Sequence, residues 1–236
     1  MSTSLKDKVI IVTGGTGRLG TAVTSLLLAR GADVTITYNR EAELARLYET
    51  IPAEHKTHLT AQQVDVTNEK SVEVFIAGVK KASGRIDGLA NLVGGWDSTP
   101  FTEMTIEKWQ QQIDLNLKSA FLMTHAVVPH MVAAKYGRIL GVGAQSAMQA
   151  RAGQAHYNVS KVGVMWLMET ISNEVKEFGV TANAILPSAI KTKEEHAKDP
   201  GGAWVRPEEI AELVAYLLSP ESGATSGAKI PVYGKK

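Results

Sequence analysis

VIIVTGGTGRLG, residues 9–20, joins a run of four aliphatic residues to a loop with glycines at positions 14, 17 and 20. A short aliphatic run closed by glycines is typical of a strand buried on both faces. A helix is expected to follow from Leu19 to Arg30, before Gly31. This order of strand, loop and helix predicts a nucleotide site, because bare backbone admits a pyrophosphate and the free amides of the helix start bind it. A plain glycine-rich turn is the competing interpretation.

Short apolar runs alternate with amphipathic stretches outward from this loop to the C-terminus. The pattern predicts further strands at residues 34–37, 60–64, 86–93, 138–142, 180–185 and 229–232, and further helices at 41–50, 69–82, 105–134, 155–178 and 207–218. Strict alternation predicts an α/β protein with parallel strands and helices on both faces. Right-handed crossovers give a seven-stranded, doubly wound Rossmann fold, which binds ligands at the carboxyl ends of its strands. No repeat or long linker interrupts the pattern, so residues 1–236 are expected to form a single domain.

The composition narrows the classes of function. The 236 residues are 44% hydrophobic and 21% charged, with a net charge of +1, so no strong field attracts nucleic acid or a membrane surface. No window of about 18 apolar residues exists, and no membrane span is expected. The chain has no cysteine, which excludes thiol nucleophiles and fits a cytoplasmic location. His125 and His130 are five residues apart and are not a metal pair, so no metal site is expected.

The end of the second strand bears on the choice of cofactor. In dinucleotide-binding folds, a carboxylate about 20 residues after the glycine loop binds the ribose hydroxyls of NAD. Here the strand ends in Thr37-Tyr38-Asn39-Arg40, without an acid. Arg40 could face a 2′-phosphate, and Arg18 could help from the loop. This pattern favours NADP(H) over NAD(H), although a solvated arginine at a helix start is a common alternative for Arg40.

Polar residues and glycine also end the third and fourth strands. Asp65 ends the third strand, where it could bind an adenine ring. Asn91 and Gly94 end the fourth strand, where they would flank the adenine ribose and let the cofactor lie close.

Tyr157 and Lys161 are candidates for acid–base chemistry. Their spacing of four places them on one face of the predicted helix 155–178. A free tyrosine has a pKa of about 10 and is a sluggish acid or base at neutral pH. A nearby ammonium favours the phenolate and lowers this pKa. The pair on its own would be a common surface feature, but it follows the fifth strand of a nucleotide-binding sheet.

Taken together, these motifs resemble those of the short-chain dehydrogenase/reductase family over nearly the whole chain. The features that match are the loop 13–20, Asp65, the segment Asn91-Leu92-Val93-Gly94, Asn116 within residues 113–117, Tyr157 with Lys161, and the segment 183–188 followed by Thr192. The resemblance implies that Tyr157 donates or accepts the proton and that Lys161 lowers its pKa and binds the nicotinamide ribose. It implies that Asn116 holds a water in a proton relay. It also implies a homo-dimer or homo-tetramer built on the helices 105–134 and 155–178.

The implied cofactor site draws on several predicted strand ends along the binding edge. Its members are Gly14, Thr16, Gly17, Arg18, Leu19, Gly20, Tyr38, Asn39, Arg40, Asp65, Val66, Asn91, Val93, Gly94, Tyr157, Lys161, Pro187, Ser188, Ile190 and Thr192. The stretch from Pro187 to Thr192 would cover the nicotinamide amide and the pyrophosphate. The polar segment 191–205 that follows is expected to be a short mobile lid over a small-molecule substrate.

The sequence departs from the family where a catalytic serine is usual, thirteen residues before the tyrosine. Ala144 stands there, so a hydroxyl for the substrate carbonyl is missing. If the chain is still extended, Ser146 faces the same side and could partly replace it; otherwise Ser146 is only a loop residue. Lesser departures are Arg18 in place of a usual glycine, Leu92 in place of an asparagine, and Ser188 in place of a glycine.

Ala144 and the segment 93–96 also resemble the dihydropteridine reductases within this family, whose acceptor is a flat quinonoid ring. Trp96 could stack on such a ring or could simply pack on its loop. We therefore expect an NAD(P)(H)-dependent oxidoreductase that acts on a carbonyl or quinonoid-type small molecule. The alternative is a nucleotide-binding regulator or scaffold with weakened catalysis, which the alanine at 144 motivates.

Overall fold

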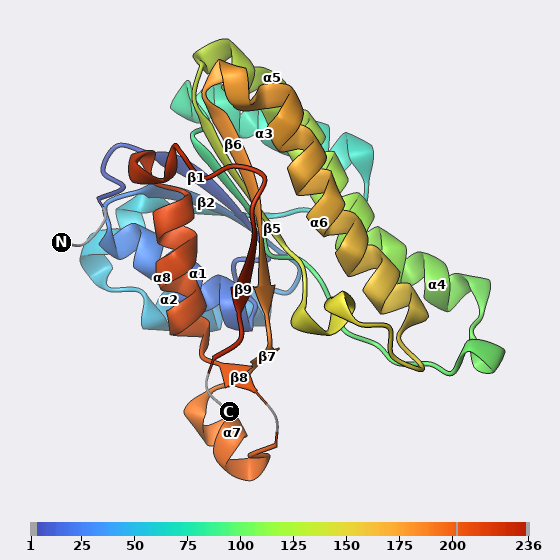
Figure 1. Cartoon of the computed structure of the whole chain (residues 1–236). Helices are drawn as coiled ribbons and strands as arrows, with labels where there is room; N and C mark the ends of the chain where they lie inside the picture. The colour runs from blue at the N-terminus through green and yellow to red at the C-terminus, as the bar shows by residue number, and fades with distance from the viewer. Residues whose placement is uncertain (1–3, 202, 235–236) are drawn as a thin grey trace.

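A computed structural model describes residues 4–201 and 203–234, and it is built around one parallel sheet (Figure 1). The strand order is β3-β2-β1-β4-β5-β6-β9. From β1 the chain adds β2 and β3 on one side and then β4, β5, β6 and β9 on the other, as in a doubly wound fold. The strands are β1 (Val9–Thr13), β2 (Asp33–Tyr38), β3 (Leu59–Gln63), β4 (Gly88–Asn91), β5 (Gly137–Val142), β6 (Val180–Pro187) and β9 (Lys229–Val232). All six pairings are parallel, and the predicted seven-stranded Rossmann fold is confirmed.

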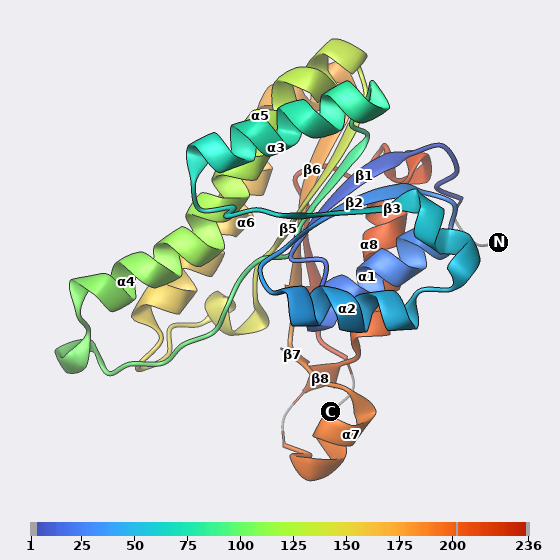
Figure 2. The same cartoon turned by 180° about the vertical axis from the view of Figure 1, so that it is seen from behind.

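Two helical layers cover the sheet, as the two views show (Figures 1 and 2). One layer holds α1 (Arg18–Ala29), α2 (Glu41–Thr50) and α8 (Pro207–Leu217); the other holds α3 (Glu69–Ser83), α5 (Ser119–Ala134) and α6 (Ala155–Val175). Strand β1 shows why the sheet needs both layers. Ile10 and Val12 pack with α1 and α8, whereas Val9 and Ile11 pack with the opposite layer. Alternate side chains of a strand point to opposite faces, so an uninterrupted aliphatic run buries both.

The predicted helix 105–134 is not one regular α-helix. It consists of α4 (Ile106–Ile113), a π-helical turn at Asp114–Lys118, and α5. Asn116 lies in this π-turn, and such turns are frequent at functional sites. The predicted helix 155–178 also ends earlier, since its last three residues form a 3₁₀ turn, Lys176–Phe178.

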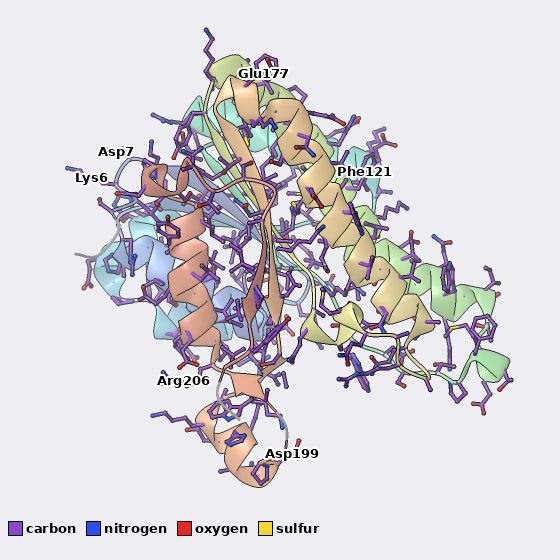
Figure 3. All side chains as sticks on the ribbon, in the orientation of Figure 1. Lys6, Asp7, Phe121, Glu177, Asp199 and Arg206 are labelled. Atoms are coloured by element: carbon purple, nitrogen blue, oxygen red, sulfur yellow. The ribbon has the colours of Figure 1, made fainter. Side chains whose placement is uncertain are left out.

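The predicted lid, segment 191–205, contains regular structure in its described residues 191–201 and 203–205. Residues Lys193–Lys198 form a short helix, α7. Strands β7 (Ala189–Ile190) and β8 (Trp204–Val205) pair in parallel and hold the base of the segment. At the far end of α7, labelled Asp199 binds Lys191 Nζ at 2.6 Å (Figure 3). The segment thus carries a short helix that a strand pair and an ion pair attach to the rest of the fold.

Candidate functional site: a nucleotide cleft with a tyrosine–lysine pair

The glycine loop leaves bare backbone at the carboxyl end of β1. Gly14 has a φ of +64°, and a Cβ on Gly20 would lie 2.0 Å from the Gly14 carbonyl oxygen. A side chain would be strained at Gly14 and would collide with the backbone at Gly20. Gly17 is the N-cap of α1 and supplies no side chain to its first-turn amides. The loop therefore has the uncovered backbone and free amides that a pyrophosphate needs.

This loop forms one wall of a cleft of about 820 Å³ at the carboxyl edge of the sheet. The cleft joins elements far apart in the sequence and is lined, among others, by Gly14, Arg18, Gly94, Trp96, Ser146, Arg151, Tyr157, Lys161, Pro187 and Ile190. The glycine cradle at one end and the tyrosine–lysine pair at the other fit a nicotinamide dinucleotide. Two further lining residues, Arg151 and Gln154, carry no signal in the sequence that marks them as part of a site.

Tyr157 and Lys161 both reach this cleft from the first turns of α6. Burial raises the pKa of the Tyr157 phenol, and a side-chain hydrogen bond with Ser146 acts in the opposite direction. Lys161 is only 6% exposed and donates from Nζ to the Val142 carbonyl oxygen at 3.0 Å. Burial lowers the pKa of Lys161 to about 8. A lowering of the Tyr157 pKa by Lys161 stays a proposal for the loaded site.

Ser146 lines the same cleft as Tyr157, although its segment is not extended. Strand β5 ends at Val142, and Gln145–Met148 form a 3₁₀ turn rather than an extended continuation. The turn, and not strand alternation, brings the Ser146 hydroxyl to Tyr157. Ala144 is buried at the edge of the same cleft, where its methyl group offers no hydrogen bond.

Asn116 fixes the loop that follows β4. Its Oδ1 accepts from the Gly95 amide at 3.0 Å, and its Nδ2 donates to the Gly95 carbonyl oxygen at 3.1 Å and to Gln112 Oε1 at 2.8 Å. The side chain thus positions the loop that carries Trp96 through both of its polar atoms. The water-holding role that the resemblance implies for Asn116 stays a proposal.

Gly94 lies where Asn116 and Lys161 converge. A Cβ at Gly94 would lie 2.6 Å from Asn116 Oδ1 and 2.9 Å from Lys161 Nζ. Both atoms are held by other hydrogen bonds, so neither can move without cost. We expect Gly94→Ala to lower kcat/KM by at least about tenfold and to destabilise the fold by about 1–3 kcal/mol, as overpacking does.

Gly78 is the matched control for this substitution. It lies in the exposed middle of α3, and a Cβ there would meet nothing within 4 Å. Gly78→Ala should leave kcat/KM unchanged and stabilise the protein by about 0.5–1 kcal/mol. Thermal unfolding and steady-state kinetics measure both effects. Equal activity and stability in wild type and Gly94→Ala would contradict the packing described for this position.

Near the end of β2, where the resemblance implies the adenosine, the structure places a carboxylate that lies outside residues 37–40. Glu43, in the first turn of α2, accepts a hydrogen bond from Thr16 Oγ1 at 3.2 Å and forms an ion pair with Arg40. Tyr38 donates to Glu41 Oε1 at 2.6 Å, and this bond raises the pKa of Tyr38. The Asn39 carbonyl oxygen accepts from Gln63. Glu43 is visible in the sequence three residues after Arg40, but the usual pattern places the acid at the strand end, and β2 already ends at Tyr38.

Arg18 does not lie beside Arg40 as a second ligand for a 2′-phosphate. It donates to the Ile190 carbonyl oxygen at 3.0 Å and pairs with Glu195 of α7 at 2.5 Å. Glu195 also completes a capping box with Thr192. Arg18 therefore joins the glycine loop to β7 and α7, because its long side chain extends toward these elements rather than toward β2.

The other predicted cofactor residues lie along the same edge, with mixed side-chain roles. Asp65 accepts from the Thr67 amide and hydroxyl, which lower its pKa. Val66 is buried in the core, so its side chain faces away from the cleft. Asn91 is buried; its Nδ2 donates to Thr124, and its Oδ1 has no partner among the described residues. Val93 donates its amide to Thr13 Oγ1 at 3.2 Å.

The residues after β6 form the opposite wall. Pro187, Ser188 and Ile190 line the cleft, and Ser188 Oγ donates to the Tyr233 carbonyl oxygen at 2.7 Å. This bond ties the wall to the C-terminal strand. Leu19 and Gly20 close the cleft from the first turn of α1.

Metal-binding clusters and membrane-spanning helices are both absent from residues 4–201 and 203–234. No group of three or more His, Asp or Glu side chains there could hold a metal ion. Within the same residues, no helix is long and apolar enough to cross a membrane.

A doubly wound sheet with a nucleotide cradle and a tyrosine–lysine pair defines a nicotinamide-dependent oxidoreductase. Comparison with known proteins narrows the class: the family model for short chain dehydrogenases matches residues 8–201. The chain belongs to the short-chain dehydrogenase/reductase family and is an NAD(P)-dependent enzyme.

The similar proteins cover nearly the whole chain. It is 31% identical over 242 residues to the 3-oxoacyl-(acyl-carrier-protein) reductase of Vibrio cholerae serotype O1, with 98% of each chain covered. It is also 31% identical to the 2,3-dihydroxy-2,3-dihydro-p-cumate dehydrogenase of Pseudomonas putida, with 98% and 94% covered. The crystal structure of gox2181 superposes with a TM-score of 0.87 at 30% identity, covering 97% and 95%. Levodione reductase, at 24% identity and a TM-score of 0.88, shows the shared fold.

Proposed function

We propose that this enzyme transfers a hydride between a nicotinamide cofactor and a carbonyl or quinonoid-type small molecule, with Tyr157 as the proton donor or acceptor. One observation carries the proposal: Tyr157, Lys161 and Ser146 line the same cleft as the glycine loop. The bound nicotinamide would supply or accept the hydride.

Each side chain of the pair has a separate task. The Tyr157 hydroxyl gives its proton to the substrate oxygen in reduction and takes it back in oxidation. Lys161, already buried beside Val142, would hold the ribose of the cofactor and keep positive charge near the phenolate. Ser146 would orient the phenol and the substrate oxygen. Asn116 keeps the Gly95 loop in place around them.

The walls of the cleft support a flat or weakly activated acceptor. Trp96 is 64% exposed and lines the cleft, which leaves its ring free to stack on a substrate. Ala144 removes one hydroxyl that would polarise a simple ketone. A quinonoid ring, or a carbonyl flanked by a second carbonyl as in 3-oxo compounds, needs less of this help.

Restoring the missing hydroxyl tests the substrate class. We expect Ala144→Ser to raise kcat/KM for a simple ketone by about tenfold, since one well-placed hydrogen bond contributes about 1 kcal/mol or somewhat more. The same variant should leave reduction of a quinonoid dihydropteridine within about twofold of wild type. Steady-state rates for both acceptors, followed by loss of the reduced cofactor, give the comparison. An unchanged ketone rate, with the variant folded, would show that position 144 does not limit carbonyl activation.

We propose that the enzyme binds NADP(H) moderately more tightly than NAD(H). No carboxylate ends β2, and Arg40 stands at that end with 76% of its side chain exposed. The difference in affinity is moderate because Arg40 is already paired with Glu43.

We further propose a homo-dimer or homo-tetramer built on the outer faces of α4, α5 and α6. Ile106, Phe121, Val159 and Trp166 are exposed large apolar side chains on these helices, and Phe121 is labelled on this layer (Figure 3). Patches of this kind mark protein interfaces. A monomeric mass in solution would contradict the assembly. The cytoplasmic location stays a proposal that rests on the lack of cysteine.

A further inference from the structure

Glu43 stands out at the adenosine end because its carboxylate faces the glycine loop rather than the solvent. Its side chain is 19% exposed, whereas that of Arg40 is 76% exposed. The carboxylate accepts from Thr16 Oγ1 at 3.2 Å, and Thr16 belongs to the phosphate-binding loop. Helix α2 therefore places an acidic side chain beside the glycine loop, whereas the end of β2 has none.

The same surface contains the end of β2. Thr37 Oγ1 accepts from the Gly14 amide, and the Thr37 carbonyl oxygen accepts from the Gly15 amide, both at 3.0 Å. These bonds hold the strand end against the loop that Glu43 contacts. In folds of this type, the group that discriminates a 2′-hydroxyl from a 2′-phosphate lies at that strand end. Glu43 is thus within the region where discrimination takes place.

The ion pair between Glu43 and Arg40 has a direct consequence for binding. Arg40 is the cation expected to bind a 2′-phosphate, and it is already neutralised by Glu43. A phosphate must either share the guanidinium with Glu43 or replace it, and in both cases the carboxylate stays close to a second anion. A 2′-hydroxyl is uncharged and can donate a hydrogen bond to the carboxylate. Specificity arises from such unfavourable contacts as well as from favourable ones.

We infer that Glu43 is a specificity-determining residue at the adenosine end of the cofactor site, where it disfavours a 2′-phosphate and favours a free 2′-hydroxyl. The inference rests on the proposed function for the place of the cofactor. It does not depend on which cofactor the wild type prefers.

The test is the dissociation constant of NADPH and of NADH, measured by titration calorimetry without any acceptor. We expect Glu43→Gln to tighten NADPH binding by about tenfold, the effect of removing one like charge at a partly exposed site. NADH binding should change less than threefold, because glutamine still accepts from Thr16. The ratio of the two constants therefore moves about tenfold toward NADPH.

Glu41→Gln is the matched control. It removes the same charge two residues away, from a carboxylate that binds Tyr38 rather than the loop. A change in the ratio as large as that of Glu43→Gln would mean a general charge effect and would overturn the inference. So would an unchanged or reversed ratio in folded Glu43→Gln. Tighter binding of NADH than of NADPH by the wild type would instead refute the NADP(H) preference proposed above. The role of Glu43 is still decided by the change in the ratio of the two dissociation constants between wild type and Glu43→Gln.

Discussion

Tyr157→Phe should lower kcat/KM by more than roughly 100-fold with any acceptor, the scale of a lost general acid. The substitution removes the phenol hydroxyl that meets Ser146 and keeps the buried ring. Because packing is retained, the affinity for the cofactor should stay within a few-fold of wild type. The loss should therefore appear in the chemical step. Calorimetric cofactor binding and steady-state turnover, measured on the same preparation, separate the two effects.

Tyr136→Phe is the control for losing a buried tyrosine hydroxyl. The Tyr136 hydroxyl is buried without a hydrogen-bond partner among the described residues and lies outside the cleft. This variant should turn over within about twofold of wild type. Near wild-type rates in Tyr157→Phe would refute the assignment of the proton donor.

Lys161→Met should lower kcat/KM by roughly 100-fold or more and also weaken cofactor binding. The methionine fills similar space but carries no positive charge, so it neither favours the phenolate nor binds a ribose hydroxyl. Weaker binding distinguishes this variant from Tyr157→Phe. Turnover and cofactor affinity both equal to wild type would show that Lys161 has no role at the site.

The same variant should change the dependence of stability on pH. Burial lowers the pKa of Lys161 from its ordinary value of 10.5 to about 8 in the folded protein, a difference that corresponds to about 3 kcal/mol. The folded state binds the proton less tightly, so the buried ammonium destabilises the fold fully below pH 8. This cost disappears as pH rises to 10.5, because the stability increases with pH wherever the unfolded state binds more protons.

We therefore expect Lys161→Met, in the absence of cofactor, to be about 1–3 kcal/mol more stable than wild type at pH 7, after the lost bond to Val142 is subtracted. The difference should shrink between pH 8 and 10.5. Urea unfolding at several pH values measures it. Lys176→Met, which removes an exposed lysine near the end of α6, should show no such dependence. A difference that is constant with pH would contradict the buried charge.

Local patterns were sufficient to predict most of the fold. Apolar runs and glycines predicted the seven strands and their parallel direction, since each signal lies within a few residues. Tyr157, Lys161 and the glycine loop followed from motifs of the same kind. Boundaries were less accurate: β4 is shorter and β6 longer than predicted, because the pairing partners decide where a strand ends.

The structure differs from the sequence predictions where contacts between distant residues, or irregular helical turns, determine the geometry. A π-turn has no periodic signature, so Asn116 was expected in a regular helix. Ser146 reaches Tyr157 through a 3₁₀ turn and not through strand alternation. The bond from Arg18 to Glu195 joins residues 177 positions apart, for which the sequence carries no sign. The helix α7 could have been predicted, because Thr192 with Glu195 forms the capping-box pattern.

The most direct measurement of the central claim follows the absorbance of reduced cofactor when the wild-type protein meets a panel of carbonyl and quinonoid acceptors, with NADPH and with NADH. Cofactor binding is measured in parallel on the same preparation. We predict binding together with oxidation of the cofactor by at least one acceptor, at a rate that Tyr157→Phe lowers by more than roughly 100-fold. Tight binding with no turnover across the panel would contradict this claim and would identify a nucleotide-binding regulator in place of an enzyme.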